Sequence, residues 1–141
     1  MADRKSRDAA PPDVPKLSAF PYLAHEADGP RLIGAECADC GKRLFPPASV
    51  CPDCMGENMR PLKLSREGTL YSYTVFHQGV RWIEPGYVAG YVDMPEGVRV
   101  FTHIDAKPED VKCDQTVVLK ETPPVHNPHG WDVLTFKFAP K

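Results

Sequence analysis

Four of the five cysteines stand in two closely spaced pairs, Cys37-Ala-Asp-Cys40 and Cys51-Pro-Asp-Cys54, with ten residues between the pairs. Two intervening residues let both sulfurs of a pair face one ion while the backbone turns its N–H groups toward them. Two such knuckles supply four thiolates, a closed tetrahedral shell that suits Zn²⁺. The spacing therefore predicts one structural zinc ion, with no open coordination position for catalysis.

Two other interpretations of the cysteine pairs stay open. The same thiolates would hold iron in a rubredoxin-like site, and two disulfides would need an oxidising compartment. The first 15 residues contain no apolar stretch of the kind a signal peptide needs, so we expect a cytoplasmic, reducing location. Gly41 and Gly56 follow the two pairs, where such turns need a positive φ, and residues 42–47 have the composition of a hairpin between the knuckles.

No catalytic residue is predicted. Cys113 stands alone in the sequence without an evident base. Of the five histidines, only His126 and His129 are spaced as a weak second metal candidate. The net charge of −2 and pI of about 6.2 give no basic excess for a nucleic-acid partner. No apolar run approaches the roughly 20 residues that cross a bilayer.

Segments of different composition follow one another along the chain. Residues 1–15 mix charge, alanine and proline, which predicts a disordered arm. In residues 16–30, Phe20, Leu23, Ala24 and Ala27 recur at helical spacing, which predicts a short helix ending at Gly29 and Pro30. Residues 31–67 hold the zinc ribbon and, from residue 61, a connector. Residues 68–141 form the last domain.

Short strands dominate that last domain. They are expected over residues 69–76, 87–94, 98–104, 116–121 and 131–138, with one helical turn at 107–110. Five antiparallel strands without long helices favour a small closed barrel such as the OB-fold, because closure removes exposed edges. An SH3-like barrel or a small sandwich explains the periodicity almost as well.

Aromatic residues gather on the first two of these strands and the loop between them: Tyr71, Tyr73, Phe76, Trp82, Tyr87 and Tyr91. Half of them should face the barrel core, and the others would form an adhesive outer surface. Base stacking on an OB-fold needs a basic groove as well, yet residues 68–98 contain Arg81 as their only Lys or Arg. A protein partner explains exposed aromatics without requiring charge.

Several segments in order resemble one known family. They are RLIGAECADCG (31–41), LFPP (44–47), CPDC (51–54), EGTLYSYTV (67–75), PGYVAGYVD (85–93) and GVRVF (97–101). This combination is similar to the zinc-ribbon/OB-fold proteins associated with acyl-CoA enzymes, long catalogued as a domain of unknown function. The family includes small zinc-containing subunits of thiolase complexes such as benzoylsuccinyl-CoA thiolase.

The resemblance implies a mainly β protein: an N-terminal helical segment, a rubredoxin-like zinc ribbon and a five-stranded OB-fold. It implies a non-catalytic subunit that partners and stabilises a thiolase-like enzyme and assists coenzyme A binding. The resemblance implies that the family's four zinc ligands correspond to Cys37, Cys40, Cys51 and Cys54. Met55 stands where the family often has glycine, so the second knuckle is expected to differ slightly.

Lys42 and Arg43 on the ribbon are the candidates for contact with the phosphates of coenzyme A, because phosphates bind Lys and Arg. A solvated charged loop tip is the alternative for both residues. For the whole chain, the alternative functions are a nucleic-acid-binding module built from the same ribbon and barrel, and an independent hydratase or hydrolase.

Overall fold

The structure is a computed structural model and describes residues 17–18, 22–79, 83–122, 125–126 and 132–141. In these residues it consists of short strands and one 3-10 turn, Pro108–Asp110, at the position of the predicted helical turn. None of the described residues belongs to a helix with the length and apolar character needed to cross a membrane. The mainly β class expected from the sequence is confirmed.

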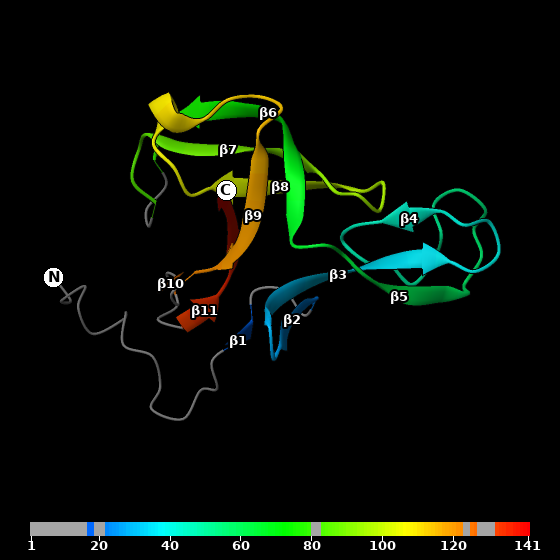
Figure 1. Cartoon of the computed structure of the whole chain (residues 1–141). Coiled ribbons are helices and arrows are strands. Elements are labelled where there is room, and N and C mark those ends of the chain that lie inside the picture. The colour runs from blue at the N-terminus through cyan, green and yellow to red at the C-terminus, as the bar shows by residue number, and fades with distance from the viewer. Residues whose placement is uncertain (1–16, 19–21, 80–82, 123–124, 127–131) are drawn as a thin grey trace, which may run out of the picture.

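A closed five-stranded barrel forms the larger part of the molecule (Figure 1). Around the barrel, neighbouring strands follow the order β12-β8-β7-β6-β9. β12 runs parallel to β8, and the other neighbouring pairs are antiparallel. The bounds are β6 (Glu67–Phe76), β7 (Tyr87–Asp93), β8 (Arg99–Ile104), β9 (Thr116–Glu121) and β12 (Phe136–Pro140).

The first four barrel strands lie close to their predicted positions, and the fifth prediction is divided. Residues 136–140 form β12, whereas Asp132–Leu134 form β11 in a separate small sheet with β1 (Leu17–Ser18) and β10 (Val125–His126). Residues 127–131 lie outside the described residues, so the start of the predicted strand falls outside them too.

The predicted N-terminal helix is wrong over the residues that the structure describes. Leu23–Glu26 form strand β2, which pairs with β3 (Gly29–Cys37) in the register Leu23↔Leu32. Pairing with β3 buries Leu23, so a tertiary contact outweighs the weak helical periodicity. Gly29, with φ of 121°, begins β3 after the turn instead of ending a helix. Phe20 and Pro21 lie outside the described residues.

The long strand β3 leads from β2 into the ribbon, where it pairs with β4 (Arg43–Leu44) and β5 (Met59–Lys63) (Figure 1). The predicted hairpin between the knuckles is replaced by β4, which returns to β3 across the first knuckle. β5 extends into the segment predicted as a connector. One hydrophobic core joins both parts, because Leu23, Leu32 and Leu64 cluster with the barrel's buried residues.

Candidate metal centre

The four predicted cysteines converge at the end of the ribbon. Their Sγ atoms all lie within 4.8 Å of one another. The Cys37–Cys54 sulfurs are 3.6 Å apart and the Cys40–Cys51 sulfurs 3.5 Å apart. A tetrahedral ion with metal–sulfur bonds of about 2.3 Å separates its ligands by about 3.8 Å, whereas a disulfide bond is about 2.05 Å long. The sulfurs are thus positioned to bind a metal ion and form no disulfide bond.

Matching backbone turns hold the two cysteine pairs. The Gly41 N–H donates to the Cys37 carbonyl at 2.9 Å, and the Met55 N–H donates to the Cys51 carbonyl at 3.0 Å. Gly41 has a φ of 78° and Met55 a φ of 61°, so the two residues occupy equivalent left-handed positions. The second knuckle therefore keeps the geometry of the first with a methionine in the glycine position.

Gly56 does not supply the positive φ that the sequence predicted, because Met55 takes that role. Gly56 instead lies in a crowded position. A Cβ at this position would lie 2.7 Å from Oδ2 of Asp39 and 3.2 Å from Sγ of Cys54. A side chain there would therefore make the Asp39 carboxylate shift away from its position beside the second knuckle.

The thiols influence one another's ionisation. Backbone N–H groups, first that of Cys54, lower the pKa of Cys51 to about 7. The Lys42 backbone N–H favours the Cys40 thiolate, but the neighbouring thiols, Cys51 first, outweigh it and raise the pKa of Cys40 to about 12. Four sulfurs this close do not all ionise unless a cation balances their charge, and a metal ion supplies that charge.

Ion pairs and hydrogen bonds surround the knuckles. Asn58, just before β5, donates to both carboxylate oxygens of Asp39 at 3.1 Å, which links this segment to the first knuckle. The carboxylate of Glu36 in β3 forms an ion pair with Arg43 at 2.7 Å and a second ion pair with Arg60. Side-chain hydrogen bonds from Arg60 and then Arg43 lower the pKa of Glu36. These contacts fasten β4 and β5 to the two sides of β3.

Lys42 and Arg43 lie beside the metal centre, at the beginning of β4. Lys42 Nζ is 3.6 Å from Oδ2 of Asp53, in the second knuckle. Arg43 donates from Nη1 to the carbonyl of Glu96 at 3.1 Å, besides its pairing with Glu36. Arg43 therefore has a structural role in the chain itself, while Lys42 makes one long, exposed ion pair.

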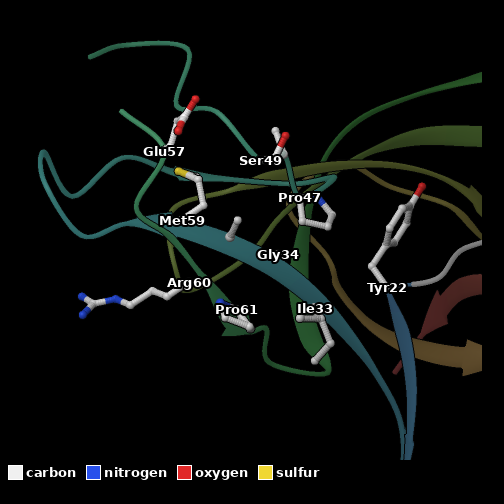
Figure 2. A pocket seen from close by; sticks show the side chains of 11 residues that line it. Tyr22, Ile33, Gly34, Pro47, Ser49, Glu57, Met59, Arg60 and Pro61 are labelled. Atoms are coloured by element: carbon white, nitrogen blue, oxygen red, sulfur yellow. The ribbon is translucent and has the colours of Figure 1, made fainter. Parts of the chain in front are cut away.

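A cavity of about 440 Å³ opens between β3, β5 and the loop after β4 (Figure 2). Figure 2 shows Gly34 of β3 between Pro47 and Met59, with Tyr22 at one end and Arg60 directed away. The wall is mainly apolar and includes Tyr22, Ile33, Pro47, Met59 and Pro61. Sequence reasoning missed this cavity, because its walls come from segments that only the pairing of β3 with β5 brings together.

The remaining candidates are scattered. Cys113 is exposed. His25 of β2 contacts Glu121 of β9 at 3.0 Å, and His103 stacks on Tyr87 with 5.0 Å between ring centroids. His129 and Trp82 lie outside the described residues, so the His126–His129 pair is not placed.

A ribbon with four convergent cysteines, followed by a closed five-stranded barrel, defines the class of zinc-ribbon/OB-fold proteins. Two family models match the chain. The one described as "ChsH2, rubredoxin-like zinc ribbon domain" matches residues 25–60, and the one described as "ChsH2, C-terminal OB-fold domain" matches residues 63–120. The chain belongs to this ChsH2 zinc-ribbon/OB-fold family, as the resemblance in the sequence indicated.

Named relatives cover much of the chain. A benzoylsuccinyl-CoA thiolase subunit BbsA from Thauera aromatica is 35% identical, over 98% of this chain and 98% of its own. A DUF35 domain-containing scaffold protein from Methanothermobacter thermautotrophicus is 31% identical, over 78% of this chain and 86% of its own. A solved structure titled "Ltp2-ChsH2(DUF35) aldolase" has a TM-score of 0.65 and 28% identity, covering 78% of this chain and 84% of that chain.

Proposed function

We propose that this chain is a non-catalytic subunit that partners and stabilises a thiolase-like enzyme acting on acyl-CoA. The observation that carries the proposal is the 35% identity to a thiolase subunit over 98% of both chains. Such end-to-end similarity supports a shared role for the whole protein, not only for the ribbon.

The four cysteines bind one Zn²⁺ in this proposal, and the ion is structural. The donor set and the sulfur separations of 3.5 and 3.6 Å fit a closed tetrahedral shell. Four thiolates leave no position for water or substrate, so the ion stabilises the ribbon and takes no part in chemistry. Zinc binding contributes on the order of 10–16 kcal/mol in small zinc peptides. Metal-bound thiolates suit a reducing compartment, so we place the protein in the cytoplasm.

The catalytic groups belong to the partner in this proposal. Cys113 is exposed and lies away from the metal knuckles in the sequence, and the knuckle cysteines are committed to the ion. In this proposal, coenzyme A binding is assisted by the cations beside the metal centre. Lys42 is the better placed of the two candidates, because Arg43 already bonds Glu36 and the carbonyl of Glu96.

Purification of the tagged chain from its native host tests the subunit function. Mass spectrometry of the eluate should identify a thiolase-like chain in near-stoichiometric amount, with about one zinc per chain by elemental analysis. Absence of a thiolase-like chain would contradict the proposal. Turnover of acyl-CoA by the isolated chain would contradict its non-catalytic character.

Coenzyme A contact needs a separate measurement on the complex. Calorimetric titration of the purified complex with coenzyme A should show weaker binding for Lys42→Ala, because a cation that meets phosphate is lost. Lys112→Ala removes an exposed lysine elsewhere on the barrel and is the matched control. If both variants bound coenzyme A with equal affinity, Lys42 would not be part of the coenzyme A site.

One observation favours a nucleic-acid-binding module as a second candidate. Tyr71, Tyr91 and Phe101 are exposed on the barrel, and OB-folds stack bases on such residues. This function predicts binding to single-stranded oligonucleotides that weakens steeply with added salt. A fluorescence anisotropy titration with labelled oligo-dT at low and high salt measures it directly.

A further inference from the structure

Six aromatic side chains share the outer face of β6, β7 and β8, and we call this surface the aromatic face: Tyr71, Phe76, Tyr87, Tyr91, Phe101 and His103. Strand register places Tyr91 opposite Phe101, and their ring centroids are 5.2 Å apart. Tyr71 lies at the bulge in β6, where the pairing shifts between Leu70 and Ser72.

Three of these residues are strongly exposed. Tyr71 is 53% exposed, Tyr91 45% and Phe101 55%. Among the described residues, the other exposed large hydrophobic residues are Met55 in the second knuckle and Val50 just before it. Single exposed apolar residues are ordinary, but a contiguous group on one face marks a place of contact.

The other three residues form a stacked layer beside the exposed ones. Phe76 stacks on Tyr87 with 4.7 Å between centroids, and Tyr87 stacks on His103 at 5.0 Å. Neighbouring strands hold each ring, since Phe76 pairs with Tyr87 in the sheet register. The face is therefore preorganised, so that binding to it orders few side chains.

The cation beside the exposed rings of the aromatic face is paired with a carboxylate. Arg99 donates to both carboxylate oxygens of Asp93, at 2.6 and 3.0 Å, and lies 3.6 Å above the ring of Tyr71. Arg99, the cation above Tyr71, is thus already paired with a carboxylate. Lys137 lies near His103, whose pKa is lowered by burial and then by this charge. Around Tyr71, Tyr91 and Phe101 a polyanion meets a paired cation, whereas an uncharged apolar protein surface meets a complementary one.

From this geometry we propose that the aromatic face docks the thiolase-like subunit, through an apolar and uncharged patch on that subunit. The proposal rests on the function proposed above. Tyr and Arg are enriched among the residues that carry binding energy in protein interfaces, and aromatic residues dominate interface cores.

The test compares tagged variants purified from the native host. Tyr91→Glu/Phe101→Glu places two charges on the face, and Lys112→Gln/Lys120→Gln changes the net charge by the same amount at exposed positions elsewhere on the barrel. Tyr91→Ser/Phe101→Ser removes the rings without adding charge. Circular dichroism, thermal melting and zinc content establish that each variant is folded.

We expect the wild type and the lysine double variant to recover the same thiolase-like chain, and both aromatic-face variants to recover at least about tenfold less. Hydroxyl-radical footprinting of the wild-type complex should show protection of Tyr71, Tyr91 and Phe101 against the free chain. Loss of the partner by the aromatic-face variants, combined with protection of these residues in the wild-type complex, would establish the docking surface.

Each contrary result has a distinct meaning. Full recovery by the aromatic-face variants would overturn the docking surface and leave the subunit function standing. Failure of the wild type to recover any thiolase-like chain would overturn the subunit function and the docking proposal with it. Light scattering of the isolated chain and the oligo-dT titration identify other occupants. Self-association or oligonucleotide binding that the face variants abolish would assign the surface to a second copy or to nucleic acid, against the proposal.

Discussion

Arg43 of the ribbon donates a hydrogen bond to the main-chain carbonyl of Glu96 in the barrel, with 3.1 Å between Nη1 and O. Glu96 lies in the turn between β7 and β8, and its Oε1 accepts hydrogen bonds from the N–H and Oγ of Ser65 at 2.7 and 2.6 Å. Ser65 belongs to the segment between β5 and β6. Ribbon, connecting segment and barrel therefore all form hydrogen bonds at Glu96, and the core that they share contains Leu32 and Leu64.

Glu96→Ala should lower the free energy of unfolding by about 1–3 kcal/mol, because it removes a charged acceptor and leaves the part-buried Ser65 N–H without its partner. Urea denaturation followed by circular dichroism measures the change. Glu109→Ala removes an exposed carboxylate in the 3-10 turn and should stay within about 0.5 kcal/mol of wild type. If Glu96→Ala were as stable as Glu109→Ala, the hydrogen bonds of the Glu96 side chain would contribute little to the stability of the protein.

Cys40→Ser should abolish stoichiometric metal binding and unfold the ribbon while much of the barrel's β-structure remains. The serine cannot supply the fourth thiolate, and the three remaining sulfurs keep the mutual repulsion of their ionised forms. Elemental analysis measures the metal, and far-ultraviolet circular dichroism with thermal melting measures the structure. Cys113→Ser, at the exposed fifth cysteine, is the control. If Cys40→Ser melted as wild type does, the metal would not be structural.

The convergence of the four cysteines could be predicted because the knuckle is a local motif. Four cysteines at fixed spacing determine which sulfurs meet, and the structure brings those four together. The strands of the barrel were predictable for a similar reason, since their alternation is local to each segment. In β8, Val100, Thr102 and Ile104 are buried while Arg99 and Phe101 are exposed.

The errors lie where pairing with another strand decides the structure. Leu23–Glu26 carry a weak helical pattern, but a hairpin with the adjacent β3 makes them a strand. β5 was not predicted because its residues, MRPLK, do not alternate clearly between apolar and polar. They form a strand because they pair with β3. The ribbon cavity and the contact of Arg43 with Glu96 likewise depend on partners that lie far away in the sequence.

Met55→Gly should stabilise the metal-bound protein by about 0.5–1 kcal/mol. Met55 has a φ of 61°, and a left-handed conformation costs a non-glycine residue about 1–2 kcal/mol. The greater flexibility of glycine in the unfolded chain offsets part of that gain. The methionine side chain is 72% exposed, so its removal sacrifices little packing. Chemical denaturation in the presence of zinc measures the difference.

Asp114→Gly is the matched comparison for Met55→Gly. Asp114 has a φ of 65°, but aspartate tolerates the left-handed region better than methionine does. Its gain should therefore be smaller. An equal gain at both positions would mean that the second knuckle stores no particular strain in Met55, and a loss of stability at Met55 would contradict the prediction outright.

The stability of the protein should fall between pH 7.5 and 5.5 in a way that depends on His103. Burial, and then the nearby charge of Lys137, lower the pKa of His103 below its ordinary value of 6.5. The unfolded chain therefore takes up a proton near pH 6.5 while the folded chain resists it, so acidification through this range favours unfolding. His103→Gln should flatten this part of the profile.

Urea denaturation of wild type, His103→Gln and His77→Gln at pH 7.5, 6.5 and 5.5 tests the dependence on His103. His77→Gln removes an exposed histidine and is the control. The paired carboxylates Glu26, Glu36 and Asp93, whose pKa values their cationic partners lower, lose their contribution only at more acidic pH. Competition between protons and metal at the cysteines acts equally on all three proteins, so it cancels in the comparison. Parallel profiles for all three would show that His103 titrates alike in the folded and unfolded chains.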